Sequence, residues 1–148
     1  MRRRSSFLIA TSVAALAIPL MASPAAAYEA ASSCQAQQPG GVVVPDGARA
    51  IGSWNWASGN SLTSVHLEAK DLRADGFSAA VRLVTKQRDG GTHYWSWHKN
   101  TKGSGTTDAW DTSATDSQGI TSTWVQGGLF SGSTLIGLCN GENRTNPD

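Results

Sequence analysis

Six tryptophans have the most distinctive chemistry in this 148-residue sequence. An indole presents a flat apolar face and one N–H donor, so tryptophans on the surface of a β-sheet can stack on sugar rings or anchor a protein partner. The alternative is that they fill the interior of a β-domain, where large apolar side chains usually lie. The six are Trp54, Trp56, Trp95, Trp97, Trp110 and Trp124. Both interpretations remain open on the sequence alone.

The best candidates for exposure are Trp54 and Trp56, which precede a turn, and Trp110, which follows a glycine-rich segment. Trp54 and Trp56 are two positions apart, so on a strand they project from the same face. Asn55 and Asp111 are their neighbours in the sequence, and amide and carboxylate groups can fix the hydroxyls of a sugar. The predicted ligand-binding residues are therefore Trp54, Asn55, Trp56, Trp110 and Asp111.

The three histidines do not predict a metal site. His93 and His98 are expected on opposite faces of one strand, and His66 belongs to a different strand, whereas metal ligands have to converge on one point. A Gly-x-Ser-x-Gly nucleophile elbow is also missing from the sequence. We therefore expect neither a metal nor an organic cofactor.

Acidic residues offer the alternative chemistry. Asp108, Asp111 and Asp116, together with Glu68, could supply the two carboxylates of a glycosidase, because only the fold decides how far apart they lie. Their spacing does not follow the calcium-binding pattern of an EF-hand loop. A small secreted hydrolase that uses acidic residues of segment 108–116 is thus the alternative function. A non-catalytic binding module is favoured, because no enzyme motif matches in residue type and spacing.

The first 27 residues have the features of a secretory signal peptide. Arg2–Arg4 precede the apolar stretch 7–21, and Ala25–Ala27 supply small residues for cleavage. The apolar stretch is shorter than the roughly 20 residues that span a membrane. Removal of the signal takes three of the 12 basic residues and none of the 11 acidic ones, and no basic cluster remains. We therefore expect a secreted, extracellular monomer that binds a polysaccharide or an extracellular protein, and neither nucleic acid nor a membrane.

The two cysteines are expected to form one disulfide. Cys34 lies close to the start of the mature chain and Cys139 close to its end. Exported proteins mature under oxidising conditions, in which an isolated pair of cysteines is normally bridged. The bridge is predicted to be structural and to bring the first and last strands together.

The clearest structural pattern is a hairpin over residues 77–98. Apolar and polar residues alternate in its first half with the period of two that marks a strand with one buried face. A three-residue loop at Asp89–Gly91 then pairs Leu83 with Trp97, and this register places Trp95 and Trp97 on the buried face. The opposite face is expected to carry Tyr94, Ser96 and His98.

The order of strand and turn signals predicts an all-β fold. About seven short strands alternate with turn residues, which is typical of an antiparallel β-sandwich, with a small β-barrel as the alternative. We predict one β-domain over residues 42–140. A signal peptide (1–27) and a loose lead-in (28–41) precede it, and a polar tail (141–148) follows it.

Three segments carry a resemblance to known sequences. They are residues 67–83, the motif Trp95-Ser-Trp-His98 and residues 110–120. In these segments the chain resembles small exported β-rich proteins of actinobacteria that have no assigned activity. The resemblance covers most of the domain and implies secretion and an all-β fold. It assigns no functional residue.

Overall fold

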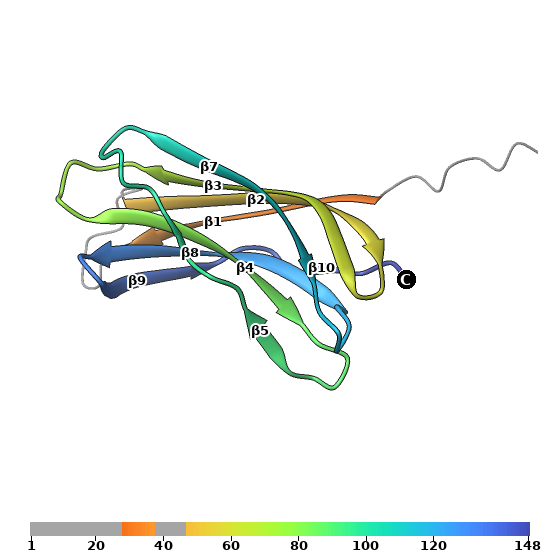
Figure 1. The fold of residues 1–148 in the computed structure, drawn as a ribbon. Coiled ribbons are helices and arrows are strands. Elements are labelled where there is room, and N and C mark those ends of the chain that lie inside the picture. The colour runs from red at the N-terminus through yellow and green to blue at the C-terminus, as the bar shows by residue number, and fades with distance from the viewer. Residues whose placement is uncertain (1–27, 38–46) are drawn as a thin grey trace, which may run out of the picture.

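The computed structural model describes residues 28–37 and 47–148. The expected signal peptide, residues 1–27, and the start of the expected domain, residues 42–46, lie outside the described residues. Figure 1 shows the described chain as two β-sheets packed face to face. Its regular structure is entirely β-strand, so the all-β antiparallel sandwich is confirmed. In the described ranges there is no helix long and apolar enough to cross a membrane.

Four strands form the first sheet, in the order β1-β2-β3-β7. All neighbouring strands are antiparallel. Buried and partly exposed residues alternate along β2, because successive side chains of a strand point to opposite faces. One face of this sheet is therefore part of the core, and the other meets solvent. The strands are β1 (Tyr28–Gln37), β2 (Gly47–Ser58), β3 (Ser61–Asp71) and β7 (Thr107–Thr115).

Six strands form the second sheet, in which β10, β8, β4 and β5 follow one another, β6 also pairs with β4, and β9 also pairs with β8. The pairing is again antiparallel throughout. Figure 1 shows the β4–β5 hairpin extending beyond the rest of this sheet. The strands are β4 (Ser78–Lys86), β5 (Thr92–Tyr94), β6 (His98–Lys99), β8 (Ser122–Ser131), β9 (Thr134–Asn140) and β10 (Arg144–Thr145).

The main hydrophobic core lies between the two sheets, and strand β2 shows how its thickness is set. Ala48, Ala50 and Gly52 share the inward face of β2 with Trp54 and Trp56. A Cβ atom added to Gly52 would lie only 2.4 Å from a side-chain carbon of the facing sheet, so the sheets are close together there. The two indoles fill the interior further along the same strand, where more volume is available.

One disulfide joins the two sheets. Cys34 of β1 and Cys139 of β9 are bonded at a sequence separation of 105, which confirms the predicted pairing. A Cβ atom added to Gly127 of β8 would lie 2.6 Å from the Cys139 Sγ atom. The bridge therefore packs directly on the inner face of β8, and glycine at this position leaves room for it.

Both ends of the described chain are more regular than expected. The predicted loose lead-in is wrong for residues 28–37, because β1 pairs with β2 over its full length. The predicted polar tail is wrong for Arg144 and Thr145, which pair with β8 as strand β10. Asn146 is also buried, and its side-chain amide donates to the carbonyl groups of Ser58 and Ile120. The described residues thus form ten strands, where about seven were expected.

The predicted hairpin exists, but its register differs from the expected one. Thr85 lies opposite His93, and the Trp95 N–H donates to the Leu83 carbonyl oxygen. Trp95 consequently lies on the core side, as expected, and packs against the main core. The left-handed residue of the loop is Gly90, with a φ of 91°, and not Gly91.

The expected faces of the residues after Trp95 are wrong, because the register shifts by one residue between β5 and β6. Ser96 and Trp97 lie opposite a single residue of β4, which is the geometry of a β-bulge. Beyond the bulge His98 pairs with Val81 and lines a cavity of about 230 Å³ between the sheets, together with Ser96. Trp97 lies on the other side of the sheet.

Candidate functional site

The expected surface pair Trp54 and Trp56 is buried. Their side chains are 1% and 5% exposed, and they contact each other edge to face with ring centroids 6.3 Å apart. Their Nε1 atoms have no hydrogen-bond partner among the described residues. The expectation that they present indole faces to a ligand is therefore wrong. Burial on the core face leaves neither ring available for stacking.

The other three predicted site residues do not share one surface. Trp110 of β7 lies opposite Leu67 and packs against the core, with its ring 5.1 Å from that of His98. Asn55 and Asp111 lie on the opposite, solvent-facing side of the four-stranded sheet, because they alternate with inward residues of β2 and β7. The five predicted residues are therefore divided between the core and the outer face of this sheet.

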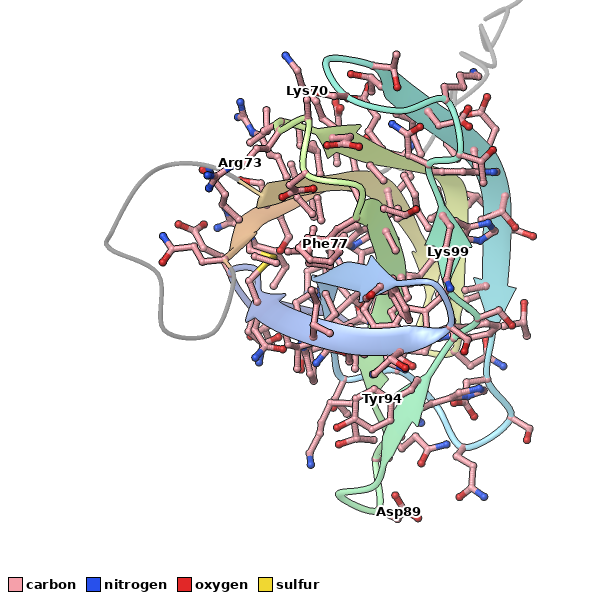
Figure 2. All side chains as sticks on the ribbon, turned by 90° about the vertical axis from the view of Figure 1, so that its left-hand side faces the viewer. Lys70, Arg73, Phe77, Asp89, Tyr94 and Lys99 are labelled. Atoms are coloured by element: carbon pink, nitrogen blue, oxygen red, sulfur yellow. A yellow bond between two sulfur atoms is a disulfide. The ribbon has the colours of Figure 1, made fainter. Side chains whose placement is uncertain are left out.

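A different surface brings exposed aromatic rings together. It is the outer face of the six-stranded sheet, and we call it the aromatic face. Tyr94 is 52% exposed, and Trp97 and Trp124 are half-buried. The aromatic face consists of Tyr94, Trp97, Trp124, Arg82, Gln126 and Asn140. Figure 2 shows Asp89 at the tip of the β4–β5 hairpin, with Tyr94 closer to the body of the sheet.

The first row across this face is aromatic. Val84 of β4 lies opposite Tyr94 of β5 on one side and opposite Trp124 of β8 on the other. Val84 is fully buried although it points away from the main core, because the side chains of the outer face cover it. Neighbouring strands lie about 4.8 Å apart, so the backbones that carry Tyr94 and Trp124 are ~10 Å apart. The two rings therefore lie on either side of a shallow apolar floor.

The second row is polar and follows the first along the strands. The Arg82 Nε atom donates to Gln126 Oε1 at 2.7 Å, and Gln126 Nε2 donates to Asn140 Oδ1 at 2.8 Å. The Arg82 guanidinium also lies 4.5 Å from the ring centroid of Tyr94 and 4.4 Å from that of Trp97. Both distances are within the range of a cation–π interaction. Burial lowers the pKa of Arg82 from its ordinary value.

The bulge after Trp95 and a glycine in β8 bring Trp97 to this face. Without the bulge, Trp97 would point to the core side like Trp95. Because two residues lie opposite Arg82, Trp97 points outward instead. Gly128 leaves room for the ring, because an added Cβ atom would lie 3.0 Å from Trp97 Cη2 and 2.9 Å from a ring carbon of Phe130. Trp97 and Phe130 contact each other edge to face at 5.4 Å. The position of Trp97 is thus held by packing.

A hollow of about 440 Å³ opens beside the two rows. Tyr94 and Trp124 give it aromatic walls, and Gln126, which is only 5% exposed, lies at its base. Most of its other lining groups are amides or backbone. The lining residues are Tyr94, Trp124, Gln126, Asn140, Gly141 and Asn143. Flat apolar walls with a few fixed polar groups between them are the usual composition of a small-molecule or oligosaccharide site.

The acidic residues of segment 108–116 are separated and already have partners. The Asp108 carboxylate forms an ion pair with Lys102 at 2.8 Å, and Asp111 forms one with His66 Nδ1 at 2.7 Å. His66 Nε2 contacts Glu68 at 3.1 Å. Hydrogen bonds with Asp111 and then with Glu68 raise the pKa of His66 above its ordinary value.

Asp116 is buried, and its carboxylate accepts three hydrogen bonds. The donors are the Gln118 N–H, the Gln87 side-chain amide and His93 Nδ1, at 2.9 to 3.0 Å. Burial opposes ionisation of this carboxyl, but the hydrogen bonds outweigh that effect and lower its pKa. The His93 ring is in turn stacked on Trp95, with centroids 4.4 Å apart. This arrangement stabilises the hairpin and leaves the Asp116 side chain only 5% exposed.

The described residues contain no group of three or more side chains that could hold a metal ion. The aromatic face can bind a ligand by stacking and hydrogen bonding, and none of its residues supplies a nucleophile paired with a base. Sequence alternation alone could have indicated that Trp124 and Gln126 share one face of β8, but the bulge that turns Trp97 outward has no clear sequence signal. No family model matches the chain, and comparisons with curated proteins and with solved structures find no match either.

Proposed function

We propose that this protein is a non-catalytic carbohydrate-binding module and that the aromatic face is its binding surface. The observation that carries the proposal is the pair of accessible rings, Tyr94 and Trp124, in a row next to a hydrogen-bonded polar row. Sugar rings have apolar C–H faces that stack on aromatic side chains, and hydroxyl groups that need fixed polar partners. The face supplies both kinds of group on one rigid sheet.

Preorganisation supports this proposal. Gln126 is nearly fully buried, and both ends of its amide are engaged, by Arg82 and by Asn140. The rings of Tyr94 and Trp97 are held by their contacts with the Arg82 guanidinium. A surface whose side chains are already ordered loses little conformational entropy when a ligand binds. The span of ~10 Å between the strands carrying Tyr94 and Trp124 suits a short stretch of polysaccharide.

We also propose that the module acts outside the cytoplasm. The disulfide between Cys34 and Cys139 supports this, because such bridges persist in oxidising compartments. The N-terminal sequence supports it as well, and cleavage after Ala27 would produce a mature chain that begins at Tyr28, the first residue of β1. Mass spectrometry of the exported protein tests this, and a product that retains residues 1–27 would contradict it.

Affinity electrophoresis in gels that contain soluble polysaccharides tests the binding function. The wild type is expected to be retarded by at least one member of a panel of β-glucan, xylan, chitin oligosaccharides and polyuronates. Tyr94→Ala and Trp124→Ala should each weaken this retardation at least about tenfold, since stacked rings of this kind are frequent energetic hot spots. Asn55→Ala and Asp111→Ala, on the outer face of the other sheet, are matched controls and should bind like the wild type.

The outcomes distinguish the alternatives. Loss of binding in the Asn55 or Asp111 variants would move the site to the four-stranded sheet. If no polysaccharide retards the wild type, the proposal is wrong, and an extracellular protein becomes the ligand to seek. The hydrolase alternative gains no geometric support, because Asp108 and Asp111 are paired with cationic groups and Asp116 is buried.

A further inference from the structure

Charge is divided unequally between the two sheets. The charged residues of the six-stranded sheet, apart from its histidines, are all cationic. They are Arg82, Lys86 and Lys99, which point to the aromatic face, and Arg144, which points to the other side and is paired with Glu142. The four-stranded sheet carries five acidic residues and only two basic ones, Arg49 and Lys70. The acidic residues are Glu29, Glu68, Asp71, Asp108 and Asp111. The formal charge of the whole chain is only +1, so the distribution, and not the total, distinguishes the aromatic face.

Arg82 lies at the centre of this cationic sheet. Its Nε atom donates to Gln126, and within the described part of the chain its guanidinium forms no ion pair. Its two terminal Nη groups likewise form no hydrogen bond with a described residue. A guanidinium that is half-buried between aromatic rings and lacks a carboxylate is an incomplete site for an anion, because its terminal donors form a planar fork that matches a carboxylate.

Two lysines extend the cationic character along the sheet. Lys99 follows His98 on β6, lies opposite Ala80, and places its Nζ atom 3.9 Å from the Phe130 ring centroid. Lys86 lies four positions along β4 from Arg82, which corresponds to ~13 Å at the rise of a strand. Figure 2 labels Tyr94 and Lys99, which mark two points along this side of the molecule. The cations are therefore distributed along the face, as a repeating anionic ligand would require.

We infer that the ligand of the aromatic face is an anionic polysaccharide built from uronic acids, with one sugar carboxylate bound by the terminal Nη groups of Arg82. The inference rests on the proposed function, since it specifies which carbohydrates bind there. Tyr94 and Trp124 stack on the sugar rings, while Arg82 recognises the charge and Lys86 and Lys99 attract the chain on either side of it. A neutral glycan would leave the Arg82 fork without its partner.

Isothermal titration with matched ligands tests this inference. Sodium polygalacturonate, alginate and hyaluronate are each compared with their carboxyl-reduced forms, which keep the sugar chain and lose the charge. At least one polyuronate is expected to bind about tenfold or more tightly than its reduced form, as a charge-assisted bidentate contact predicts. Its affinity should also fall as sodium chloride is raised, because exposed charges are screened.

Variants assign the effect to Arg82. Arg82→Gln removes the charge and should reduce the preference for the acidic form to nearly onefold, and Arg82→Lys, which keeps the charge but loses the fork, should restore it only partly. Arg49→Gln and Lys70→Gln remove cations from the other sheet and are matched controls that should leave the preference unchanged. Circular dichroism and the urea midpoint confirm that each variant is folded.

The possible results separate this inference from the proposed function. Equal affinity for acidic and reduced glycans, or binding of neutral glycans alone, would overturn the inference and leave the binding module intact. Absence of binding to every glycan would overturn both. Dextran sulfate and a thymidine oligonucleotide serve as other polyanions, and binding of either as tightly as the best polyuronate would overturn the assignment of a carboxylate sugar as the ligand.

Discussion

Gln126 illustrates how a single residue organises the aromatic face. It is almost completely buried on a sheet surface, where an unpaired amide would cost about 1–3 kcal/mol. Its oxygen accepts from Arg82 and its nitrogen donates to Asn140, so the amide is paired at both ends. The orientation of the Arg82 guanidinium between Tyr94 and Trp97 thus follows from the pairing of β4 with β8. A polar residue in the sheet thereby positions the aromatic ones.

The same reasoning applies to Asp116, whose three donors make it the best connected carboxylate described above. Asp116→Asn should lower the free energy of unfolding by about 1–3 kcal/mol, because Oδ2 accepts from Gln87 and His93 while Oδ1 accepts from the Gln118 N–H, and an amide has only one acceptor oxygen. Urea unfolding at neutral pH measures this. Asp111→Asn is the control, since the Asp111 side chain is 87% exposed and should contribute less than about 1 kcal/mol. Equal effects of the two substitutions would contradict the description of Asp116.

His66 predicts a pH dependence of stability. Its pKa is raised in the folded state by Asp111 and then by Glu68, so its contribution is complete below the ordinary value of 6.5 and is lost as the pH rises through the higher folded-state pKa. The urea midpoint of the wild type should therefore fall more than that of His66→Gln between about pH 6 and pH 8.5. The difference should remain below about 1 kcal/mol, because the pair is exposed. Parallel curves for the two proteins would contradict this prediction.

Among the elements, strand β2 and the β4–β6 segment differ in how far their sequences predict their structure. On β2, Trp54 and Trp56 point to the same side as three small residues, Ala48, Ala50 and Gly52. A series of small apolar residues on one side of a strand indicates that this side faces the core. The burial of the two tryptophans was therefore accessible from the sequence. The bulge at Trp97 was not, because it depends on the partner strands β4 and β8 and on the space left by Gly128.

The different burial of Trp54 and Trp97 leads to a prediction about the stability of their alanine variants. Trp54→Ala should destabilise the protein by about 3–5 kcal/mol, the usual cost of removing a large aromatic residue from a core. Trp97→Ala should cost clearly less, because Trp97 is half-buried on the outer face and part of its area already meets water. Urea denaturation of both variants measures the difference. A larger loss for Trp97 than for Trp54 would show that the outward orientation of Trp97 is wrong.

At the scale of the whole molecule, one side of the six-stranded sheet packs in the core, and the other side carries the aromatic face, for which we propose a binding role. The sandwich architecture and the disulfide were predictable from periodicity and cysteine count. The aromatic face was not, because Arg82 and Gln126 lie 44 positions apart in the sequence and meet only through strand pairing. Over residues 29–37 the inner face of strand β1 carries only small residues, which give a weak alternation signal, and the pairing of this strand with β2 also depends on tertiary contacts.

The disulfide holds this first strand to the rest of the fold. Cys34 and Cys139 close a loop of 105 positions, and a crosslink of about 100 residues lowers the entropy of the unfolded chain enough to stabilise the folded state by ~4 to 5 kcal/mol. The Cys34→Ala, Cys139→Ala double variant should therefore unfold at much lower urea concentration than the oxidised wild type, and reduced wild type should resemble the variant. Urea unfolding with and without a reductant measures both.

The double variant is expected to keep the strand content of the wild type in circular dichroism, because β1 also pairs with β2 along its length. A loss below about 1 kcal/mol would show that the bridge constrains the unfolded chain far less than loop closure predicts.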